Sequence, residues 1–219
     1  MKQIFNLEEI IFVPTQACNL RCAHCFVPKN AEKLNLEKSL AFLNDAIDGG
    51  VSQIGFSGGE PFLALDFVCA IVQKTVEKGA YFDRLMTNAA AFEGEEMKAA
   101  IEKLFDAGFD GTFGISFDAF HAQKIETIAS FINAVEEIYQ ERNHISLVCT
   151  IHADAQADAK TTAMLKELAA ELDLTIEADE DTGFPCALVY KDKLETFMND
   201  GREADIIPVE TINKINIFS

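Results

Sequence analysis

The chain has 219 residues, enough for one large domain with a buried core. Its formal charge of −18, from 18 basic and 36 acidic residues, argues against a nucleic acid partner, because phosphate binding needs a basic face. No stretch is typical of a secretory signal, and no window reaches the roughly 18 apolar residues that a membrane span requires. We therefore expect a cytoplasmic protein, in which cysteines stay reduced and a cluster of them indicates metal binding or catalysis.

Short β-branched or aromatic runs alternate with longer stretches of helical period along most of the chain. This alternation is typical of parallel strands joined by crossover helices. It allows either an open doubly wound sheet or a barrel, and the period alone does not choose between them. Six strands are predicted, within residues 10–15, 51–59, 81–88, 111–120, 144–153 and 174–178.

Five helices are predicted between these strands. In the first of them, Leu36, Leu40, Leu43 and Ile47 are spaced for one helix face, and two glycines follow. The helices are expected within residues 36–50, 64–79, 94–108, 122–140 and 159–172.

The alternation ends near Asp179, where the sequence becomes charged and rich in turns. One helix is expected at residues 192–199, and residues 215–219 look like the start of a further strand. We therefore divide the chain into a core at residues 1–180 and an irregular C-terminal extension, or the start of a further module, at residues 181–219.

The unusual polar residues follow the predicted strands at their carboxyl ends. In a parallel sheet these ends lie on one edge, where α/β proteins bind ligands. Polar loop residues at strand ends are common, but they do not explain three cysteines or a double glycine followed by an acid. In strand order, the residues are Cys18, Cys22 and Cys25; Ser57, Gly58, Gly59 and Glu60; Thr87 and Asn88; Ser116 and Asp118; and Thr150 and His152.

The cysteines after the first strand have the spacing Cys18-x3-Cys22-x2-Cys25. Iron–sulfur clusters and zinc are the usual partners of closely spaced cytosolic thiolates. Three thiolates on a four-iron cluster leave one iron without a protein ligand, which is an open position for a substrate or cofactor. A zinc-binding module would instead need a fourth ligand, for which the sequence offers His24 or Cys186.

This cysteine motif, together with Gly58-Gly59-Glu60 after the second strand, resembles the signature pair of radical S-adenosylmethionine (SAM) enzymes. The resemblance extends over about residues 9–180. It implies an α/β fold, a partial (β/α)6 barrel similar to a TIM barrel, and so favours the barrel over the open sheet. It also implies a [4Fe–4S] cluster that binds SAM at its open iron, reductive cleavage of SAM, and hydrogen abstraction from a substrate.

The resemblance also implies which residues bind the cofactors. Glu60 would accept hydrogen bonds from the amino group of the cofactor's methionine, and Gly58 and Gly59 would allow close approach of the backbone. The backbone of His24 would contact adenine. The implied cluster ligands are Cys18, Cys22 and Cys25, and the implied SAM-binding residues are His24, Ser57, Gly58, Gly59, Glu60, Asn88, Ser116, Asp118, Thr150 and His152.

Several of these positions keep a second interpretation. Ser116 and Asp118 suit ribose hydroxyls, but a solvated strand end explains them equally well. Ala89 stands where the family has the glycine of Thr-Asn-Gly, which indicates a less strained turn. A lone histidine is more often structural, so His121 is left out of the predicted site.

The resemblance implies an electron donor such as flavodoxin or ferredoxin, and it leaves the substrate open. Peptides are a candidate, because many similar enzymes with cysteine-rich C-terminal domains act on them. Cys186 is the only cysteine past the fifth predicted strand, so a complete auxiliary cluster cannot form within these residues. The alternative is an iron–sulfur electron-transfer or scaffold protein, which would need the cysteines but not Glu60 or the other polar strand ends.

Overall fold

The structure is a computed structural model that describes residues 7–141, 143–150, 155–178, 185–190 and 207–209. Six parallel strands form the main sheet and lie across it in chain order. This confirms the expected α/β fold, and within the described residues the sheet is open between its first and last strands, as in a partial barrel. The strands are β1 (Glu9–Phe12), β2 (Gln53–Phe56), β3 (Tyr81–Thr87), β4 (Thr112–Ser116), β5 (Ile145–Thr150) and β8 (Ile207–Val209).

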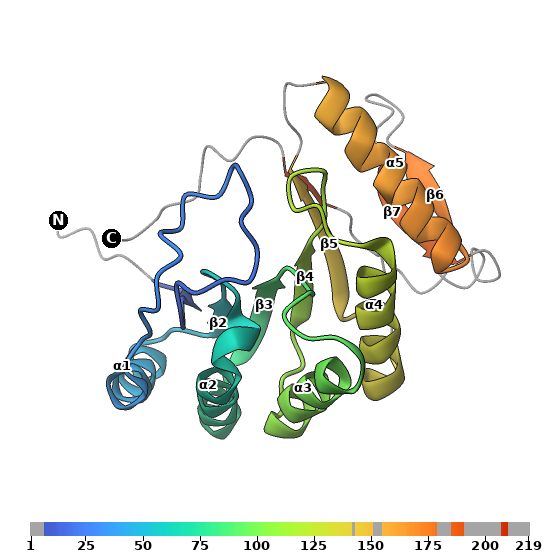
Figure 1. The fold of residues 1–219 in the computed structure, drawn as a ribbon. Helices are drawn as coiled ribbons and strands as arrows, with labels where there is room; N and C mark the ends of the chain where they lie inside the picture. Colours follow the sequence, from blue (N-terminus) through green and yellow to red (C-terminus); the bar gives the residue numbers. More distant parts are fainter. Residues whose placement is uncertain (1–6, 142, 151–154, 179–184, 191–206, 210–219) are drawn as a thin grey trace, which may run out of the picture.

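Helices follow the first four strands and cover one face of the main sheet (Figure 1). Local sequence signals set their ends. The Asn35 side chain caps the first helix by accepting a hydrogen bond from the N–H of Lys38. The second and third helices end at Gly79 and Gly108, whose φ angles of +70° and +95° suit glycine. The helices are α1 (Leu36–Asp48), α2 (Leu65–Lys78), α3 (Gly94–Ala107) and α4 (Ile125–Tyr139), and a short 3-10 helix, η1 (Pro61–Ala64), precedes α2.

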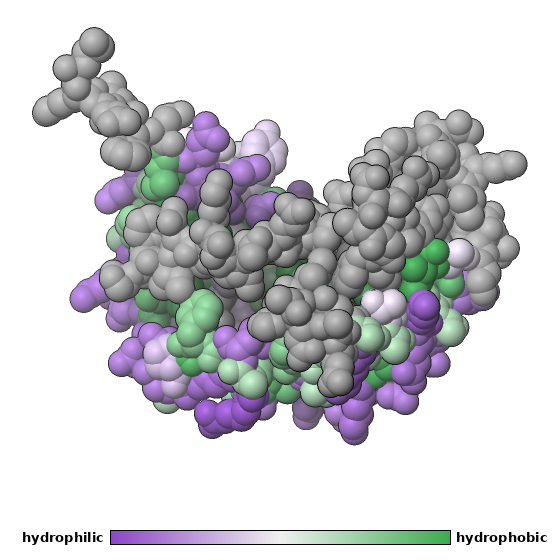
Figure 2. All heavy atoms as spheres, turned by 90° about the horizontal axis from the view of Figure 1, so that it is seen from above, coloured by the Kyte–Doolittle hydropathy of each residue, from purple (hydrophilic) through white to green (hydrophobic). Residues whose placement is uncertain are grey.

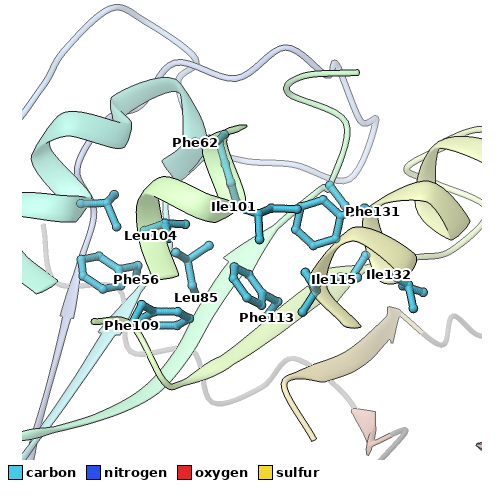
Figure 3. Close-up of a cluster of buried hydrophobic side chains, with 14 of the residues drawn as sticks. Phe56, Phe62, Leu85, Ile101, Leu104, Phe109, Phe113, Ile115, Phe131 and Ile132 are labelled. Atoms are coloured by element: carbon cyan, nitrogen blue, oxygen red, sulfur yellow. The ribbon is translucent and has the colours of Figure 1, made fainter. Parts of the chain in front are cut away.

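The apolar core lies between the sheet and these helices and is rich in phenylalanine. Phe113 on β4 is fully buried, and its ring centroid lies 5.3 Å from that of Phe109 and 5.7 Å from that of Phe131 on α4. Leu85 and Ile115 lie beside these rings (Figure 3). Because successive residues of a strand point to opposite faces, the residues between these core positions belong to the face that the helices leave uncovered.

A second, two-stranded sheet corrects one prediction. Strand β6 (Leu174–Ala178) pairs antiparallel with β7 (Pro185–Tyr190), and both contact α5 (Ala155–Glu171). The expectation that residues 174–178 continue the parallel sheet is therefore wrong, and β8 takes that place beside β5. Only Leu172 and Asp173 separate α5 from β6, so β6 stays close to its own helix and pairs with the strand that follows it.

The C-terminal extension is described only in part. The helix predicted at residues 192–199 and the strand predicted at residues 215–219 lie outside the described residues. The predicted boundary at residue 180 falls between β6 and β7, which pair with each other, and the division into two parts stays a prediction.

Hydrophilic side chains line much of the described surface in the view from above (Figure 2). This agrees with a composition that includes 36 acidic and 18 basic residues. Among the helices of the described ranges, none is both long enough and apolar enough to cross a membrane.

Candidate active site

The loop between β1 and α1 carries the three clustered cysteines. Cys18, Cys22 and Cys25 are half-buried and form no disulfide. The N–H of Cys25 donates to the carbonyl of Cys22 at 3.2 Å, and the N–H of Leu20 donates to Cys18 Sγ at 3.4 Å. The loop therefore folds back on itself and keeps three thiols partly exposed at the carboxyl end of β1.

Residues just after β3 fix this loop in place. Asn88 Nδ2 donates to Asn19 Oδ1 at 2.9 Å and to Cys18 Sγ at 3.6 Å. Asn19 Nδ2 in turn donates to the carbonyl of Ala90 at 2.7 Å. Sequence reasoning selected Asn88 as a site residue but missed Asn19, because the partners of Asn19 are about 70 positions away and no local pattern marks them.

A lysine of the same loop was also missed. Lys29 Nζ donates to the carbonyl of Leu20 at 3.0 Å, which brings its positive charge close to the thiols. Burial raises the pKa of the Cys22 thiol, and Lys29 opposes part of this shift. A metal that binds Cys22 must therefore displace a proton from it, and Lys29 makes that easier.

Gly58 and Gly59 lie directly against the start of the cysteine loop. The N–H of Gly59 donates to the carbonyl of Thr15 at 2.9 Å, and the N–H of Glu60 donates to the carbonyl of Ala17 at 2.7 Å. A Cβ at Gly59 would lie 2.1 Å from the carbonyl oxygen of Ala17, and Gly58 has a φ of +118°. The absence of side chains at Gly58 and Gly59 thus lets the backbone before Cys18 pack directly against them. Their predicted contact with a ligand stays a prediction.

Glu60 is fully buried between the ends of β2 and β3. Its Oε1 accepts hydrogen bonds from the N–H of Phe62 at 3.1 Å and from the Thr87 hydroxyl at 2.8 Å, and its Oε2 accepts one from the N–H of Asn88 at 2.8 Å. Burial raises the pKa of Glu60 to about 7, although the three donors favour the carboxylate and lower it. Glu60 therefore joins two strand ends, and its predicted contact with SAM stays a prediction.

Asp118 is fully buried just after β4. Its Oδ1 accepts a hydrogen bond from the N–H of Phe120 at 2.9 Å and lies 2.7 Å from His121 Nδ1. The ring of His121 lies against that of His24, with the ring centroids 4.8 Å apart. These contacts connect the end of β4 to the cysteine loop, and the predicted contact of Asp118 with ribose stays untested.

Two glutamines at this edge, the buried Gln123 and the half-buried Gln16, were not predicted. Gln123 Nε2 donates to the carbonyls of Asn88 and Ser116 and so ties the end of β3 to the end of β4. Gln16 Oε1 and Gln123 Oε1 are buried and have no hydrogen-bond partner in the part of the chain that the structure describes. Buried polar atoms normally have hydrogen-bond partners, so these two oxygens are suited to accept hydrogen bonds from a ligand. SAM fits them, because it carries ammonium and hydroxyl donors.

The predicted residues of the first four strands thus share one edge of the sheet. Ser57 and Ser116 are half-buried there, and the N–H of Ser57 donates to the carbonyl of Phe12 at 2.9 Å. For the fifth strand, Thr150 ends β5 but its side chain is not described, and His152 lies outside the described residues. The roles predicted for these residues stay predictions.

The cysteine loop suits an iron–sulfur cluster better than a closed zinc site. Within the described ranges, no three His, Cys, Asp or Glu side chains are grouped closely enough to hold one metal ion together. Zinc binds its sulfur ligands at about 2.3 Å from a single centre, whereas the cysteines of a four-iron cluster bind separate iron atoms.

A family model agrees with this assignment. The model of the Radical SAM superfamily matches residues 12–152, which hold the three cysteines and the Gly58-Gly59-Glu60 segment. This chain belongs to the radical SAM superfamily. The family uses a [4Fe–4S] cluster and SAM. The recognition made from the two sequence motifs is therefore confirmed.

Known radical SAM proteins share part of this sequence. The chain is 32% identical to PqqA peptide cyclase of Methylobacterium nodulans over 124 residues, which are 55% of this chain and 31% of that protein. It is 27% identical to the S-adenosylmethionine-dependent nucleotide dehydratase of Selenomonas ruminantium over 170 residues, 76% of this chain and 59% of that protein. The chain thus spans about a third of the length of the PqqA peptide cyclases that it matches.

The fold is also similar to solved structures of this superfamily. One such structure is anSMEcpe with bound AdoMet and Cp18Cys peptide, which superposes on this chain with a TM-score of 0.59. The matched region covers 91% of this chain and 63% of the anSMEcpe chain. The sequence identity is 16%, so this similarity supports the fold alone. It agrees with an open sheet that forms part of a barrel.

Proposed function

We propose that this chain is the core of an enzyme that cleaves SAM reductively and abstracts a hydrogen atom from a substrate. The observation that carries the proposal is the meeting of three half-buried cysteines and the fully buried Glu60 at one edge of the parallel sheet. Asn88 contacts both features, because its N–H donates to Glu60 and its amide donates to Cys18. An electron-transfer protein would need the cysteines but not this buried polar network.

Each part of the site has a separate task in this proposal. When bound, the cluster and SAM supply an electron and a carbon radical, and the protein supplies position and exclusion of water. Cys18, Cys22 and Cys25 would hold the cluster as thiolates. Gln16 and Gln123 accept hydrogen bonds from SAM through their unpartnered amide oxygens.

The remaining contacts to SAM follow the family resemblance. Glu60 receives the amino group of the methionine part, Ser116 and Asp118 receive ribose hydroxyls, and the backbone of His24 contacts adenine. Asp118 already accepts hydrogen bonds from its own turn, so Ser116, which is half-buried, is the more accessible of the two for a hydroxyl.

We further propose a peptide substrate, a flavodoxin or ferredoxin as electron donor, and a cytoplasmic location in which the thiols stay reduced. The name PqqA peptide cyclase supports a peptide. The name of the nucleotide dehydratase points to nucleotides instead, so the test below does not depend on the substrate.

The test is anaerobic reconstitution with iron and sulfide, followed by reduction and addition of SAM. The wild-type protein is expected to turn brown and to release 5′-deoxyadenosine, which chromatography detects. Cys22→Ala is expected to lose both the colour and the product. Cys69→Ala is the matched control, because Cys69 is buried in α2 and far along the chain from the loop, and it is expected to keep both.

Two outcomes contradict the proposal. Brown protein that releases no 5′-deoxyadenosine supports an iron–sulfur protein without cofactor cleavage. Colour and product that survive in Cys22→Ala show that the cluster ligands are assigned incorrectly.

A further inference from the structure

The face of the main sheet that α1 to α4 leave uncovered carries two neighbouring charged residues of β3. Strand β3 has a bulge opposite Gly55 of β2, so that Asp83 and Arg84 together stand against this one residue. Phe82 and Leu85, on either side of the pair, pack into the core under the helices. Asp83 and Arg84 therefore both belong to the uncovered face, although successive residues of a regular strand alternate between faces.

Two glycines on this face make room for long charged side chains. A Cβ at Gly114 of β4 would lie 2.5 Å from Arg84 Cδ and 2.8 Å from Arg84 Cγ. A Cβ at Gly55 would lie 3.3 Å from Glu9 Oε1, which comes from β1. The stem of the Arg84 side chain thus lies over β4, and the carboxyl group of Glu9 lies over β2.

Each of these two head groups keeps a buried atom that lacks a hydrogen-bond partner. Among the described residues, Arg84 Nε and Glu9 Oε1 are both buried and unpaired. No ion pair in the described ranges includes Arg84, although acidic residues outnumber basic ones by 36 to 18 in the chain. A buried donor and a buried acceptor without partners are unfavourable unless a ligand or water pairs with them.

The carboxyl group of Asp83 adds a third charge to this face. Burial raises the pKa of Glu9, the negative charge of Asp83 and a hydrogen bond between the two carboxyl groups raise it further, and the positive charge of Arg84 opposes the shift. The carboxyl groups of Glu9 and Asp83 therefore lie close together, and their negative charges repel each other when both are ionised. A hydrogen-bond donor that approached Glu9 from a ligand would relieve this repulsion.

We propose that Arg84 binds a carboxylate of the enzyme's substrate and that Glu9 accepts a hydrogen bond from an N–H group beside that carboxylate. The inference rests on the proposed function, which requires a substrate within reach of the cofactor edge. Arg84 is three residues before Thr87, so it lies roughly 10 Å from the carboxyl edge at about 3.3 Å per strand residue. A substrate held by Arg84 can extend from there to the cofactor edge.

The charges around Arg84 select an amino acid or peptide group over a phosphate chain. A guanidinium matches a single carboxylate with two parallel hydrogen bonds. A diphosphate or triphosphate would bring several negative charges beside Glu9 and Asp83, with one guanidinium to balance them. An amino acid or peptide instead offers one carboxylate together with an amide or ammonium N–H for Glu9.

The test uses the full chain with its cluster reconstituted and oxidised. Two probes are titrated: N-acetylglutamate methylamide and its uncharged counterpart, N-acetylglutamine methylamide. NMR follows the Nε–Hε signals of the four arginines of the chain, and Arg84→Lys assigns the signal of Arg84. The glutamate probe is expected to move this signal saturably and to bind about tenfold more tightly, or better, than the glutamine probe, because it makes a charge-assisted hydrogen bond.

Variants give a second measurement by calorimetry. Arg84→Gln is expected to weaken binding of the glutamate probe about tenfold or more. Lys74→Gln removes the same charge from a surface ion pair with Glu77 and is expected to leave the affinity unchanged. The inference is overturned by equal affinity for both probes, by an Arg84 signal that does not move, or by tighter binding of pyrophosphate than of the glutamate probe.

The titration needs neither reduction nor SAM, so its result is separate from that of the cleavage test. Probe binding that depends on Arg84 in a protein that releases no 5′-deoxyadenosine refutes the proposed function and keeps the anion site. Release of 5′-deoxyadenosine by a protein that does not distinguish the two probes refutes the anion site alone.

Discussion

The helix-covered face of the main sheet and the carboxyl edge of the same sheet bury different kinds of side chain. The face buries apolar rings and branched chains such as Phe113 and Ile115, whereas the edge buries Glu60, Asn88 and Asp118. Apolar burial is non-directional and depends mainly on the area removed from water. Buried polar groups depend on particular partners, and here those partners come from segments far apart in the chain.

The difference indicates that the helix-covered face mainly provides stability, whereas the carboxyl edge mainly positions the groups that would bind the cofactors. Removal of a core ring is expected to lower the free energy of unfolding without moving the cysteine loop. Removal of an edge group is expected to have a smaller effect on stability and a larger effect on the position of the cysteines. The predictions that follow test this separation in order of decreasing effect on stability.

The largest loss of stability is expected for Phe113→Ala. Its ring is fully buried among other rings, so its removal leaves a cavity and should lower the free energy of unfolding by about 3–5 kcal/mol. Urea denaturation measures this. Phe105→Ala, at a position that is 47% exposed, should cost about 1 kcal/mol, and equal losses at the two positions would show that the core assignment is wrong.

Gly59→Ala should disturb the edge more than its small size suggests. The added Cβ would meet the carbonyl oxygen of Ala17 at 2.1 Å, so the backbone that leads into the cysteines must shift, at a cost of roughly 1–3 kcal/mol. The expected result is a lower yield of reconstituted cluster, read from its visible absorption. The control is Gly79→Ala at the end of α2, where a Cβ meets nothing within 4 Å. The φ of +70° strains an alanine there, but away from the cysteine loop, so a normal cluster yield is expected.

Glu60 should make the free energy of unfolding depend on pH, which the apolar residues of the core do not. Burial raises the pKa of Glu60 to about 7 from 4.5, so the folded state binds this proton more tightly than the unfolded state does. The contribution of Glu60 to the free energy of unfolding is therefore fully present below pH 4.5 and decreases as the pH rises to about 7, with a limiting slope of about 1.4 kcal/mol per pH unit.

Urea denaturation of the wild-type protein and of Glu60→Gln at several pH values gives the difference in their free energies of unfolding. This difference should change between pH 4.5 and 7 and be constant above that range. A difference that does not vary with pH would mean that Glu60 is ionised throughout and that its three donors outweigh its burial. Glu60→Gln should also lose about 1–3 kcal/mol, because one amide oxygen cannot replace two acceptor oxygens.

The smallest effect on stability is expected for Asn19→Ala. This change removes hydrogen bonds to Ala90 and from Asn88 at an exposed position, so the free energy of unfolding should fall by about 1 kcal/mol. Reconstitution of the cluster should nevertheless be slower than in the control Asn44→Ala, which removes an exposed hydrogen bond to Asp48 on α1. Equal rates in the two variants would show that Asn19 does not position the loop.

Much of the fold and part of the site could be predicted from the sequence because their signals are local. Alternating runs and helical periods located β1 to β5 and their helices. The spacing Cys18-x3-Cys22-x2-Cys25 and the Gly58-Gly59-Glu60 segment identified the superfamily, since both motifs are short and contiguous. Cys69 and Cys149, predicted to lie in a helix and a strand, are buried there with raised thiol pKa values and take no part in the loop.

The predictions failed or were incomplete where distant segments compete for the same partner. Residues 174–178 have the pattern of a strand, and that pattern is satisfied equally well beside β5 or beside β7. Asn19, Lys29 and Gln123 belong to common residue types, and nothing in their neighbourhood along the chain marks them as site residues. Their importance appears only in the contacts that they make.

The sequence by itself determined the strand–helix alternation and the two short motifs that identify the superfamily, because these depend on residues close together along the chain. The tertiary structure alone decided which strand pairs with β6, how Glu60 becomes buried, and how a bulge in β3 brings Asp83 and Arg84 onto one face. The physical reason is that periodicity and spacing are set locally, whereas burial and pairing arise from packing between segments tens of residues apart.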